Sequence, residues 1–273
     1  MAVTRCAVLG SPIAHSLSPV LHRAAYAELG LDWTYDAIEV DESGLAGFLA
    51  GLGDGWRGLS LTMPLKRVVV PLLQDLDPWA AASGAANTVV LEDGRRHGHN
   101  TDVPGAVNAL TERVAGPLAS AVVLGGGATA ASVLLALSEV GCSKARLLVR
   151  NPARAVDTLA ALDRHGRGPQ ISVGRLGESL GVADVLVSTI PVEAQGPDLV
   201  AVAAGAAVVF DVLYDPWPTP LADAAAAHGR TVISGLDLLV HQAALQVRLM
   251  TGSDVPVAVL RSAGERALAD GAR

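Results

Sequence analysis

Four short polar segments interrupt the otherwise apolar first hundred residues of the chain. They are Ser16-Leu17-Ser18-Pro19, Thr62-Met63-Pro64-Leu65-Lys66, Asn87-Thr88 and Asn100-Thr101-Asp102. Together they offer hydroxyls, amides, one carboxylate and one ammonium, a set suited to a small polyhydroxylated acid. For any single Ser, Thr or Asn, a role as helix cap or turn residue is the simpler interpretation.

The predicted strands explain how these segments would meet. Each segment sits at the end of a strand-like run, and ligand-facing side chains collect at strand ends in an open α/β sheet. Residues 88–91 and 96–99 form the arms of a predicted hairpin that turns at residues 92–95. Its open end places Asn87 beside Asn100, so we expect the four segments to form one pocket.

Composition indicates a globular α/β protein and argues against a nucleic-acid partner. Apolar residues make up 51% of the 273 residues, charged residues 17% and aromatic residues 3%, so the interior must be largely Ala, Val and Leu. The formal net charge of -7 has the wrong sign for a nucleic-acid surface. No apolar run is long enough to span a bilayer, so we expect a cytoplasmic protein with no membrane partner.

The cysteines and histidines predict no metal site. Cys6 and Cys142 form no CxxC motif and have no ligand spacing to histidine, which favours two buried thiols in a reducing compartment. His97 and His99 share one face of a hairpin arm, but no carboxylate or cysteine set completes a ligand group. We therefore expect these two histidines to be a surface pair.

Strands and helices alternate along the chain, which predicts two α/β domains with parallel sheets and crossover helices. The N-terminal domain is expected to be mainly parallel, and a Rossmann-type doubly wound domain should follow a boundary near residue 103. The last two helices, residues 236–251 and 255–269, follow the last strand and should pack back on the first domain. The predicted domains are therefore residues 1–103 with 236–273, for substrate binding and catalysis, and residues 104–235, for the cofactor.

A glycine-rich turn opens the second domain. It lies between a strand-like run at residues 121–124 and a helix expected over residues 128–141. In a dinucleotide-binding turn Gly125 would permit the tight turn, Gly127 would let the backbone approach a pyrophosphate, and Ala130 would keep helix and strand close. The N–H groups of the helix N-terminus suit phosphates. Tight turns without a ligand are about as common, so the turn alone leaves both interpretations open.

The residues after the next strand, 145–149, favour NADP over NAD. An NAD-specific protein usually carries an acidic residue there, which binds the ribose 2′-hydroxyl. This chain has Arg150 and Arg154, and a guanidinium can bind a 2′-phosphate through bidentate hydrogen bonds. Arg150, at the strand end, is the stronger candidate, whereas a solvated helix position explains Arg154 equally well.

The whole pattern resembles the shikimate dehydrogenase family, from Ala7 to the helix around Gln242. Besides the four polar segments, it rests on Asp211-Val212-Leu213-Tyr214-Asp215-Pro216, Thr219-Pro220-Leu221 and the stretch from Gly235 to Ala244. The resemblance implies NADP-dependent, reversible reduction of 3-dehydroshikimate to shikimate, on the pathway to aromatic amino acids. It leaves open a monomer or a homodimer.

The resemblance also implies roles for individual residues. Ser16 and Ser18 are similar to carboxylate-binding serines, and Lys66 takes the catalytic position. Contacts to the substrate ring and its hydroxyls are implied for Thr62, Asn87, Asp102, Tyr214 and Gln242. Cofactor contacts are implied for Gly125, Gly126, Gly127, Ala128, Thr129, Arg150, Asn151, Arg154, Val212 and Gly235. The chain departs from the family pattern at Ser60, where Asn is frequent, and at Ala128, Val149 and Leu238.

Lys66 and Asp102 also suit the chemistry on physical grounds. Hydride delivery to a ketone builds negative charge on oxygen, which needs a proton or a positive group nearby. A lysine is ordinarily an ammonium at neutral pH, and a neighbouring carboxylate favours that form. Moreover, the first turn of a helix is a poor place for a cation, so Lys66 in a helix starting at Pro64 suggests a function.

Two other functions remain open. A quinate/shikimate dehydrogenase of broader specificity would share the scaffold, although Ser18 and Arg150 favour shikimate and NADP. The alternative that is not an enzyme is a catalytically silent NADP-binding module, since a protein can keep a fold without its catalytic activity. The presence of both Lys66 and Asp102 disfavours that second alternative.

Overall fold

The computed structural model describes residues 3–178 and 181–271 of the chain. These residues form two compact units, unit 1 with Met1–Thr101 and Leu239–Arg273 and unit 2 with Asp102–Leu238. Each unit contains one six-stranded sheet. The expected two-domain α/β fold is confirmed.

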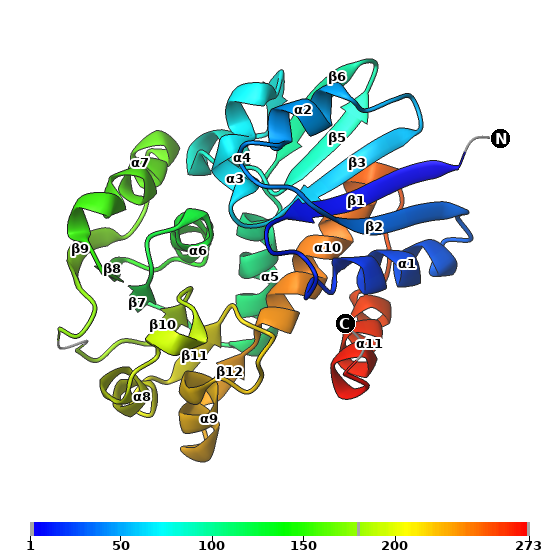
Figure 1. The fold of residues 1–273 in the computed structure, drawn as a ribbon. Helices are drawn as coiled ribbons and strands as arrows, with labels where there is room; N and C mark the ends of the chain where they lie inside the picture. Colours follow the sequence, from blue (N-terminus) through cyan, green and yellow to red (C-terminus); the bar gives the residue numbers. More distant parts are fainter. Residues whose placement is uncertain (1–2, 179–180, 272–273) are drawn as a thin grey trace. The chain divides into compact units, whose positions relative to one another are not determined.

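The sheet of unit 1 has the strand order β2-β1-β3-β5-β6-β4 (Figure 1). Strand β1 pairs in parallel with β2 and β3, and β4 pairs in parallel with β6, whereas β5 runs antiparallel to both β3 and β6. Parallel pairs therefore outnumber antiparallel ones. The strands are β1 (Thr4–Gly10), β2 (Trp33–Glu39), β3 (Trp56–Leu61), β4 (Asp75–Leu76), β5 (Thr88–Glu92) and β6 (Arg95–His99).

Alternation along β1 divides the interior of unit 1 into two cores, because successive strand residues point to opposite faces. Ala7 and Leu9 pack with the face covered by α2 (Leu45–Ala50), α3 (Leu65–Val68) and α4 (Pro78–Ser83). Cys6 and Val8 belong to the other core, which includes Tyr26 of α1 (Ser18–Glu28) and Met250 of α10 (Gly235–Thr251). Helix α11 (Val257–Ala269) packs against α1. The C-terminal helices thus pack on the first domain, as expected.

The predicted hairpin is present and turns at Asp93-Gly94. Both residues have positive φ, 50° and 71°, as a two-residue type I′ turn requires, and Asp-Gly is a favoured pair for it. Thr88 pairs with His99 at the open end. This pairing places Asn87 and Asn100 next to each other.

Unit 2 has the doubly wound arrangement. Its strand order is β12-β11-β10-β7-β8-β9 with every neighbouring pair parallel. Helices α5, α6 and α7 pack in series on one face, and α8 and α9 pack together on the other (Figure 1). The strands are β7 (Ser120–Leu124), β8 (Lys144–Val149), β9 (Gln170–Arg175), β10 (Val185–Ser188), β11 (Val208–Asp211) and β12 (Thr231–Ile233). The helices are α5 (Asp102–Arg113), α6 (Ala128–Glu139), α7 (Val156–His165), α8 (Pro197–Ala203) and α9 (Pro220–Ala227).

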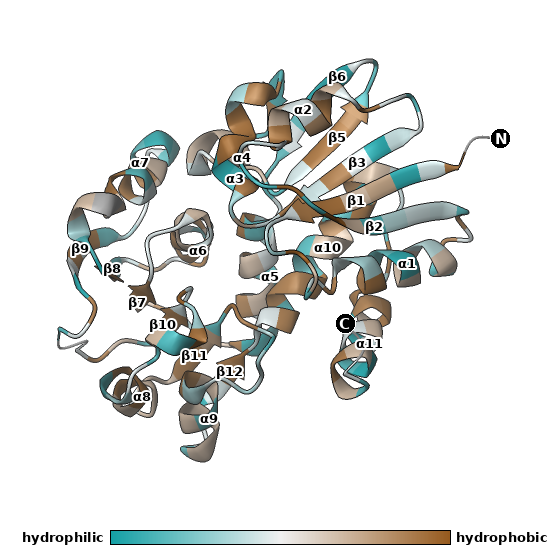
Figure 2. Ribbon diagram, viewed as in Figure 1, coloured by the Kyte–Doolittle hydropathy of each residue, from teal (hydrophilic) through white to brown (hydrophobic). Residues whose placement is uncertain are grey.

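Helices cover both faces of this second sheet, so its inner strands are apolar along most of their length. Figure 2 shows this for β7 and β11. On the α8 and α9 side, Val122, Leu124 and Val209 pack with Leu199 and Leu221. The carboxyl ends of β7 and β8 carry the glycine-rich turn and Arg150.

The sequence pattern did not predict α4 or β4, although α4 carries a clear start signal. Asp77 caps this helix by accepting a hydrogen bond from Ala80 N at 2.6 Å, and Pro78 occupies its first position. Short 3₁₀ turns lie at Val70–Leu72, Pro152–Ala155 and Val192–Ala194. Over the described residues, no helix combines the length and apolar character needed to cross a membrane.

Candidate active site

Backbone hydrogen bonds gather the polar segments of unit 1 at one edge of its sheet. Thr62 N donates to Leu9 O at 2.9 Å, and Ser11 N donates to Met63 O at 3.1 Å. A Cβ on Gly10 would collide with the Thr62 side chain, so a glycine lets the first loop pass this closely. Asn87 was expected to follow a strand, but it precedes β5. It reaches the same edge because β5 runs antiparallel to β3, and Leu61 N donates to Asn87 O at 2.8 Å.

Lys66 lies on α3, a single helical turn. The Lys66 carbonyl accepts a hydrogen bond from Ala86 N at 2.8 Å, which ties its backbone to the residue before Asn87. Leu65 is fully buried beside it and anchors the turn, while the Lys66 side chain is half-buried. Lys66 is not confined to a first helical turn, as expected from the sequence, because α3 ends at Val68 and Lys66 lies in its first and last turn at once. The helix dipole therefore gives no reason for a special role of Lys66.

Asn87, Thr101 and Gln242 form a buried polar cluster, although Asn87 and Gln242 are 155 positions apart in the sequence. Asn87 Nδ2 donates to Thr101 Oγ1 at 2.9 Å and to Gln242 Oε1 at 3.2 Å. Asn87 Oδ1 accepts from Thr101 N at 2.8 Å and from Thr88 Oγ1 at 2.9 Å. Both amides predicted as ring contacts therefore meet at the start of β5.

Ser16 and Ser18 lie at the start of α1. Ser16 Oγ accepts a hydrogen bond from the backbone N–H of Ser18 at 3.3 Å, which holds the Ser16 side chain against the start of α1. Ser18 is buried on the inner face of α1, one helical turn before His22. Thr62, the neighbouring predicted contact, is half-buried after the end of β3.

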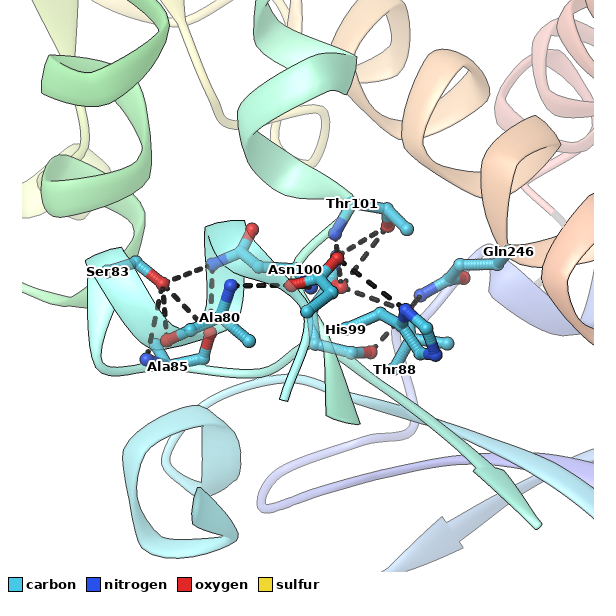
Figure 3. Close-up of polar contacts among 10 residues, drawn as sticks. Ala80, Ser83, Ala85, Thr88, His99, Asn100, Thr101 and Gln246 are labelled. Atoms are coloured by element: carbon cyan, nitrogen blue, oxygen red, sulfur yellow. Dashed lines mark hydrogen bonds and ion pairs between the residues drawn. The ribbon is translucent and has the colours of Figure 1, made fainter. Parts of the chain in front are cut away.

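Asn100 holds the loop before Asn87 in place. Asn100 Nδ2 donates to Ser83 Oγ at 2.8 Å and to Ala85 O at 3.0 Å, and Ser83 Oγ also donates to Ala85 O (Figure 3). This loop contains Ala86, whose N–H binds the Lys66 carbonyl. These contacts of Asn100 stabilise the backbone on which Lys66 and Asn87 depend.

Two further predicted substrate contacts belong to unit 2. Asp102 follows Thr101 directly and begins α5, where the free N–H groups of a helix start favour a carboxylate. Tyr214 is half-buried in the loop after β11. That loop is anchored by buried Asp211, whose carboxylate accepts from Thr219 Oγ1 at 2.7 Å and from Gln195 Nε2 at 2.8 Å. Burial raises the pKa of the Asp211 carboxyl, and these hydrogen bonds oppose the rise.

The three positions between β7 and α6 are glycine for different physical reasons. Gly125 has φ of +105°, and a Cβ there would collide with the Thr189 side chain, whereas a Cβ on Gly126 would lie 2.9 Å from Val149 Cγ1. Gly127 has an ordinary extended backbone, and none of the described protein atoms lies within 4 Å of a Cβ built on it. Nothing in the protein itself therefore requires glycine at 127. Open space there fits the close approach of a pyrophosphate to the N-terminus of α6, which has no side-chain cap.

The remaining predicted cofactor residues follow the strands β7, β8, β11 and β12 of unit 2. Arg150 follows β8 and is exposed, and Asn151 Oδ1 caps the next turn by accepting from Ala153 N at 3.1 Å. The side chain of Arg154 lies outside what the structure describes. Val212 follows β11, and a Cβ on Gly235 would collide with the Val212 carbonyl, so this glycine permits the close backbone contact. Ala128 and Thr129 form the first turn of α6.

Comparison with known proteins identifies the family. The substrate binding domain of shikimate dehydrogenase matches residues 8–89, and the shikimate 5′-dehydrogenase C-terminal domain matches residues 235–263. The NADP(+)-dependent shikimate dehydrogenase of Moorella thermoacetica is 38% identical over 266 residues, covering 93% of this chain and 90% of that protein. The chain belongs to the shikimate dehydrogenase family.

Solved structures of shikimate dehydrogenases share the fold over almost the whole chain. The enzyme of Mycobacterium tuberculosis superposes with a TM-score of 0.86 at 38% identity, covering 96% of this chain and 99% of that one. The Thermus thermophilus enzyme, solved in complex with NADP(H) and shikimate, gives a TM-score of 0.82 at 33% identity, covering 97% and 100%. The resemblance stated from sequence motifs is confirmed.

In this member of the shikimate dehydrogenase family, sequence reasoning missed a second buried glutamine. Gln246 lies one helical turn after Gln242 on α10 and is 1% exposed. Its amide contacts Ser60, Thr88, His22 and the Asn87 carbonyl. The available signal was the i, i+4 spacing of two glutamines on an otherwise apolar helix face. Among the described residues, no group of three or more His, Cys, Asp or Glu could hold a metal ion.

His22 is the polar partner of Gln246 on α1. It is fully buried, stacks on Tyr35 with ring centroids 4.0 Å apart, and its Nε2 lies 3.2 Å from Gln246 Oε1. An amide oxygen can only accept, so Nε2 carries a hydrogen in this contact. Burial lowers the pKa of His22 from 6.5 to about 4, despite this hydrogen bond.

The buried imidazole should make folding stability depend on pH. The unfolded chain takes up a proton at His22 below about pH 6.5, whereas the folded chain resists protonation down to about pH 4. Stability from His22 is therefore complete above pH 6.5 and lost as the pH falls, by about 1 kcal/mol between pH 7.5 and 5.5. Urea unfolding of the parent and of His22→Gln at both pH values measures this difference. Equal losses in the two proteins would contradict the assignment.

Proposed function

We propose that this protein catalyses the NADPH-dependent, reversible reduction of 3-dehydroshikimate to shikimate. Family membership supports the reaction, and the NADP(+)-dependent relatives support the cofactor. The observation that carries the proposal is the gathering of Lys66, Asn87 and Gln242 at one edge of the first sheet, through the Lys66 carbonyl and the Asn87 amide. An ammonium and two amides at one place suit a substrate with a reacting ketone and several hydroxyls.

The proposed chemistry needs a proton at the carbonyl oxygen. NADPH, when bound, supplies the hydride. Lys66 would donate a proton to the developing alkoxide during reduction and accept it back during oxidation. Asp102 would orient Lys66 and accept a hydrogen bond from a substrate hydroxyl.

The other assignments describe binding. Ser16 and Ser18 would bind the substrate carboxylate, and ring contacts would come from Thr62, Asn87, Tyr214 and Gln242. The cofactor would bind at the turn between β7 and α6, with contacts from Gly125, Gly126, Gly127, Ala128, Thr129, Arg150, Asn151, Arg154, Val212 and Gly235. The open space at Gly127 is the structural feature that best supports this cofactor site.

The sequence further favours a cytoplasmic enzyme that acts as a monomer or a homodimer. Cys6 and Cys142 are buried free thiols, as suits a reducing compartment. Sedimentation of the purified protein at several concentrations would measure its oligomeric state.

One assay tests the proposed reaction against its alternatives. Purified protein is mixed with shikimate or quinate, each with NADP or NAD, and the reduced nicotinamide is followed by absorbance. We expect rapid oxidation of shikimate with NADP. Comparable rates with quinate would favour the broader enzyme, and no turnover with any pair would favour a silent binding module.

Arg150 should carry most of the preference for NADP over NAD. Replacing it with leucine removes charged hydrogen bonds to the 2′-phosphate and should weaken NADP binding by about 1.5 to 3 kcal/mol. NAD lacks this phosphate and is the control ligand, whose affinity should not change. Fluorescence titration of both cofactors measures the effect. Unchanged NADP affinity in Arg150→Leu would show that another group binds the phosphate.

A further inference from the structure

Gln246 makes as many hydrogen bonds as a side-chain amide can make. Its Oε1 accepts from Ser60 Oγ at 2.9 Å and from His22 Nε2 at 3.2 Å. Its Nε2 donates to Thr88 Oγ1 at 2.9 Å and to Asn87 O at 3.1 Å. A glutamine amide has two acceptor sites and two hydrogens, so all four are used within unit 1. Gln246 therefore has no group left for a ligand, although it lies one turn from Gln242.

The hydrogen bonds around Gln246 run in one direction. An amide nitrogen only donates, so Thr88 Oγ1 must accept from Gln246 and is left to donate its own hydrogen to Asn87 Oδ1, 2.9 Å away. With its oxygen held by Thr88 Oγ1 and Thr101 N, Asn87 turns Nδ2 toward Gln242 Oε1. Each donor fixes the next group in the chain from His22 to Gln242.

The direction of these hydrogen bonds determines whether Gln242 can donate to a ligand or accept from it. Gln242 Oε1 already accepts from Asn87, and one Nε2 hydrogen goes to Leu239 O at 3.1 Å. The second Nε2 hydrogen of Gln242 takes part in none of the hydrogen bonds that the structure describes. Gln242 is thus set to meet a ligand as a hydrogen-bond donor, and a ligand hydroxyl there must accept.

We infer that Gln246 is a positioning residue for the substrate site, acting through Thr88 to hold the Asn87 amide and, through it, the Gln242 side chain in place. This inference rests on the proposed function, because shikimate is the ligand whose hydroxyl these amides would bind. Without Gln246, Thr88 can turn its hydrogen elsewhere. The Asn87 oxygen then keeps Thr101 as a donor but loses Thr88, so the Asn87 amide, and through it the Gln242 side chain, is held less firmly.

A double-mutant cycle on the enzyme tests this route. Gln246→Met keeps the length and burial of the side chain but removes its hydrogen bonds, and Thr88→Val removes the link to Asn87. Each should raise KM for shikimate about tenfold and leave KM for NADP within twofold. Because both act through the same route, the double variant should also show about a tenfold rise, and not the hundredfold product of independent effects.

Tyr35→Phe is the matched control. The Tyr35 hydroxyl donates to Ser60 Oγ at 2.6 Å, so the variant loses a buried hydrogen bond of the same cluster, while the four bonds of Gln246 remain. It should lower Tm but leave KM for shikimate within twofold. If Gln246→Met does not fold, the contrast between Thr88→Val and Tyr35→Phe still decides the question.

Three results would overturn the inference: unchanged KM in Gln246→Met or Thr88→Val, a hundredfold rise in the double variant, or a rise in KM that follows the loss of Tm in all variants, the control included. The parent enzyme separates this inference from the proposed function. A parent that does not oxidise shikimate overturns both, whereas an active parent with unaffected variants overturns only the role of Gln246.

Discussion

Lys66→Ala should lower kcat for shikimate oxidation by a factor of about 10² to 10⁴, the usual contribution of one positioned proton-transfer group. Both KM values should change much less, because the amides and hydroxyls proposed to bind the substrate remain. The backbone of α3 is held by Leu65 and by the bond from Ala86 N to the Lys66 carbonyl, and neither depends on the Lys66 side chain. Steady-state kinetics in both directions measures the effect.

Lys144→Ala is the matched control for this prediction. Lys144, the other lysine of the chain, lies exposed at the start of β8 in unit 2, so the same truncation there should leave kcat within twofold. A folded Lys66→Ala protein that binds NADP and still turns over shikimate within a few-fold of the parent would remove Lys66 from the mechanism. Tyr214 or an ordered water would then be the next candidate for the proton donor.

Gly127→Val should abolish tight NADP binding while leaving the fold intact. The backbone at Gly127 is extended, with φ of -88° and ψ of -172°, and a Cβ there meets no described protein atom within 4 Å. The added side chain would instead occupy the space proposed for the pyrophosphate. Losing two or more charged hydrogen bonds, at about 1.5 to 3 kcal/mol each, corresponds to at least a hundredfold loss of affinity.

Thermal unfolding without cofactor and titration with NADP test both halves of this prediction. Tm of Gly127→Val should lie close to that of the parent, whereas addition of NADP should raise Tm of the parent alone. Gly125→Ala is the contrasting variant. Its Cβ would collide with Thr189, and its φ is positive, so Tm itself should fall. A Gly127→Val protein that binds NADP like the parent would place the pyrophosphate elsewhere.

Local sequence signals predicted most of the elements correctly. Asp93-Gly94 fixed the hairpin turn because both positions need positive φ. The helix over residues 128–141 and the strand over 145–149 correspond to α6 and β8 within a few residues. The helix expected from Pro64 is α3, which is only one turn long because the chain then enters the 3₁₀ turn at Val70–Leu72. The pattern also missed α4, whose cap and proline were visible but whose length is only six residues.

By itself, the sequence determined which chemical groups are present and which family motifs contain them, because each motif is a local run of residues. It therefore pointed to Lys66, Asn87 and Gln242 as separate candidates. Only the tertiary structure decided which groups share hydrogen bonds. The antiparallel pairing of β5 and the return of α10 to unit 1 bring Asn87 and Gln246 together from 159 positions apart. Burial makes an unpaired polar atom costly, so the donors and acceptors that surround each of these side chains determine the direction of its hydrogen bonds. No local pattern encodes that direction, because it depends on contacts among four separate elements.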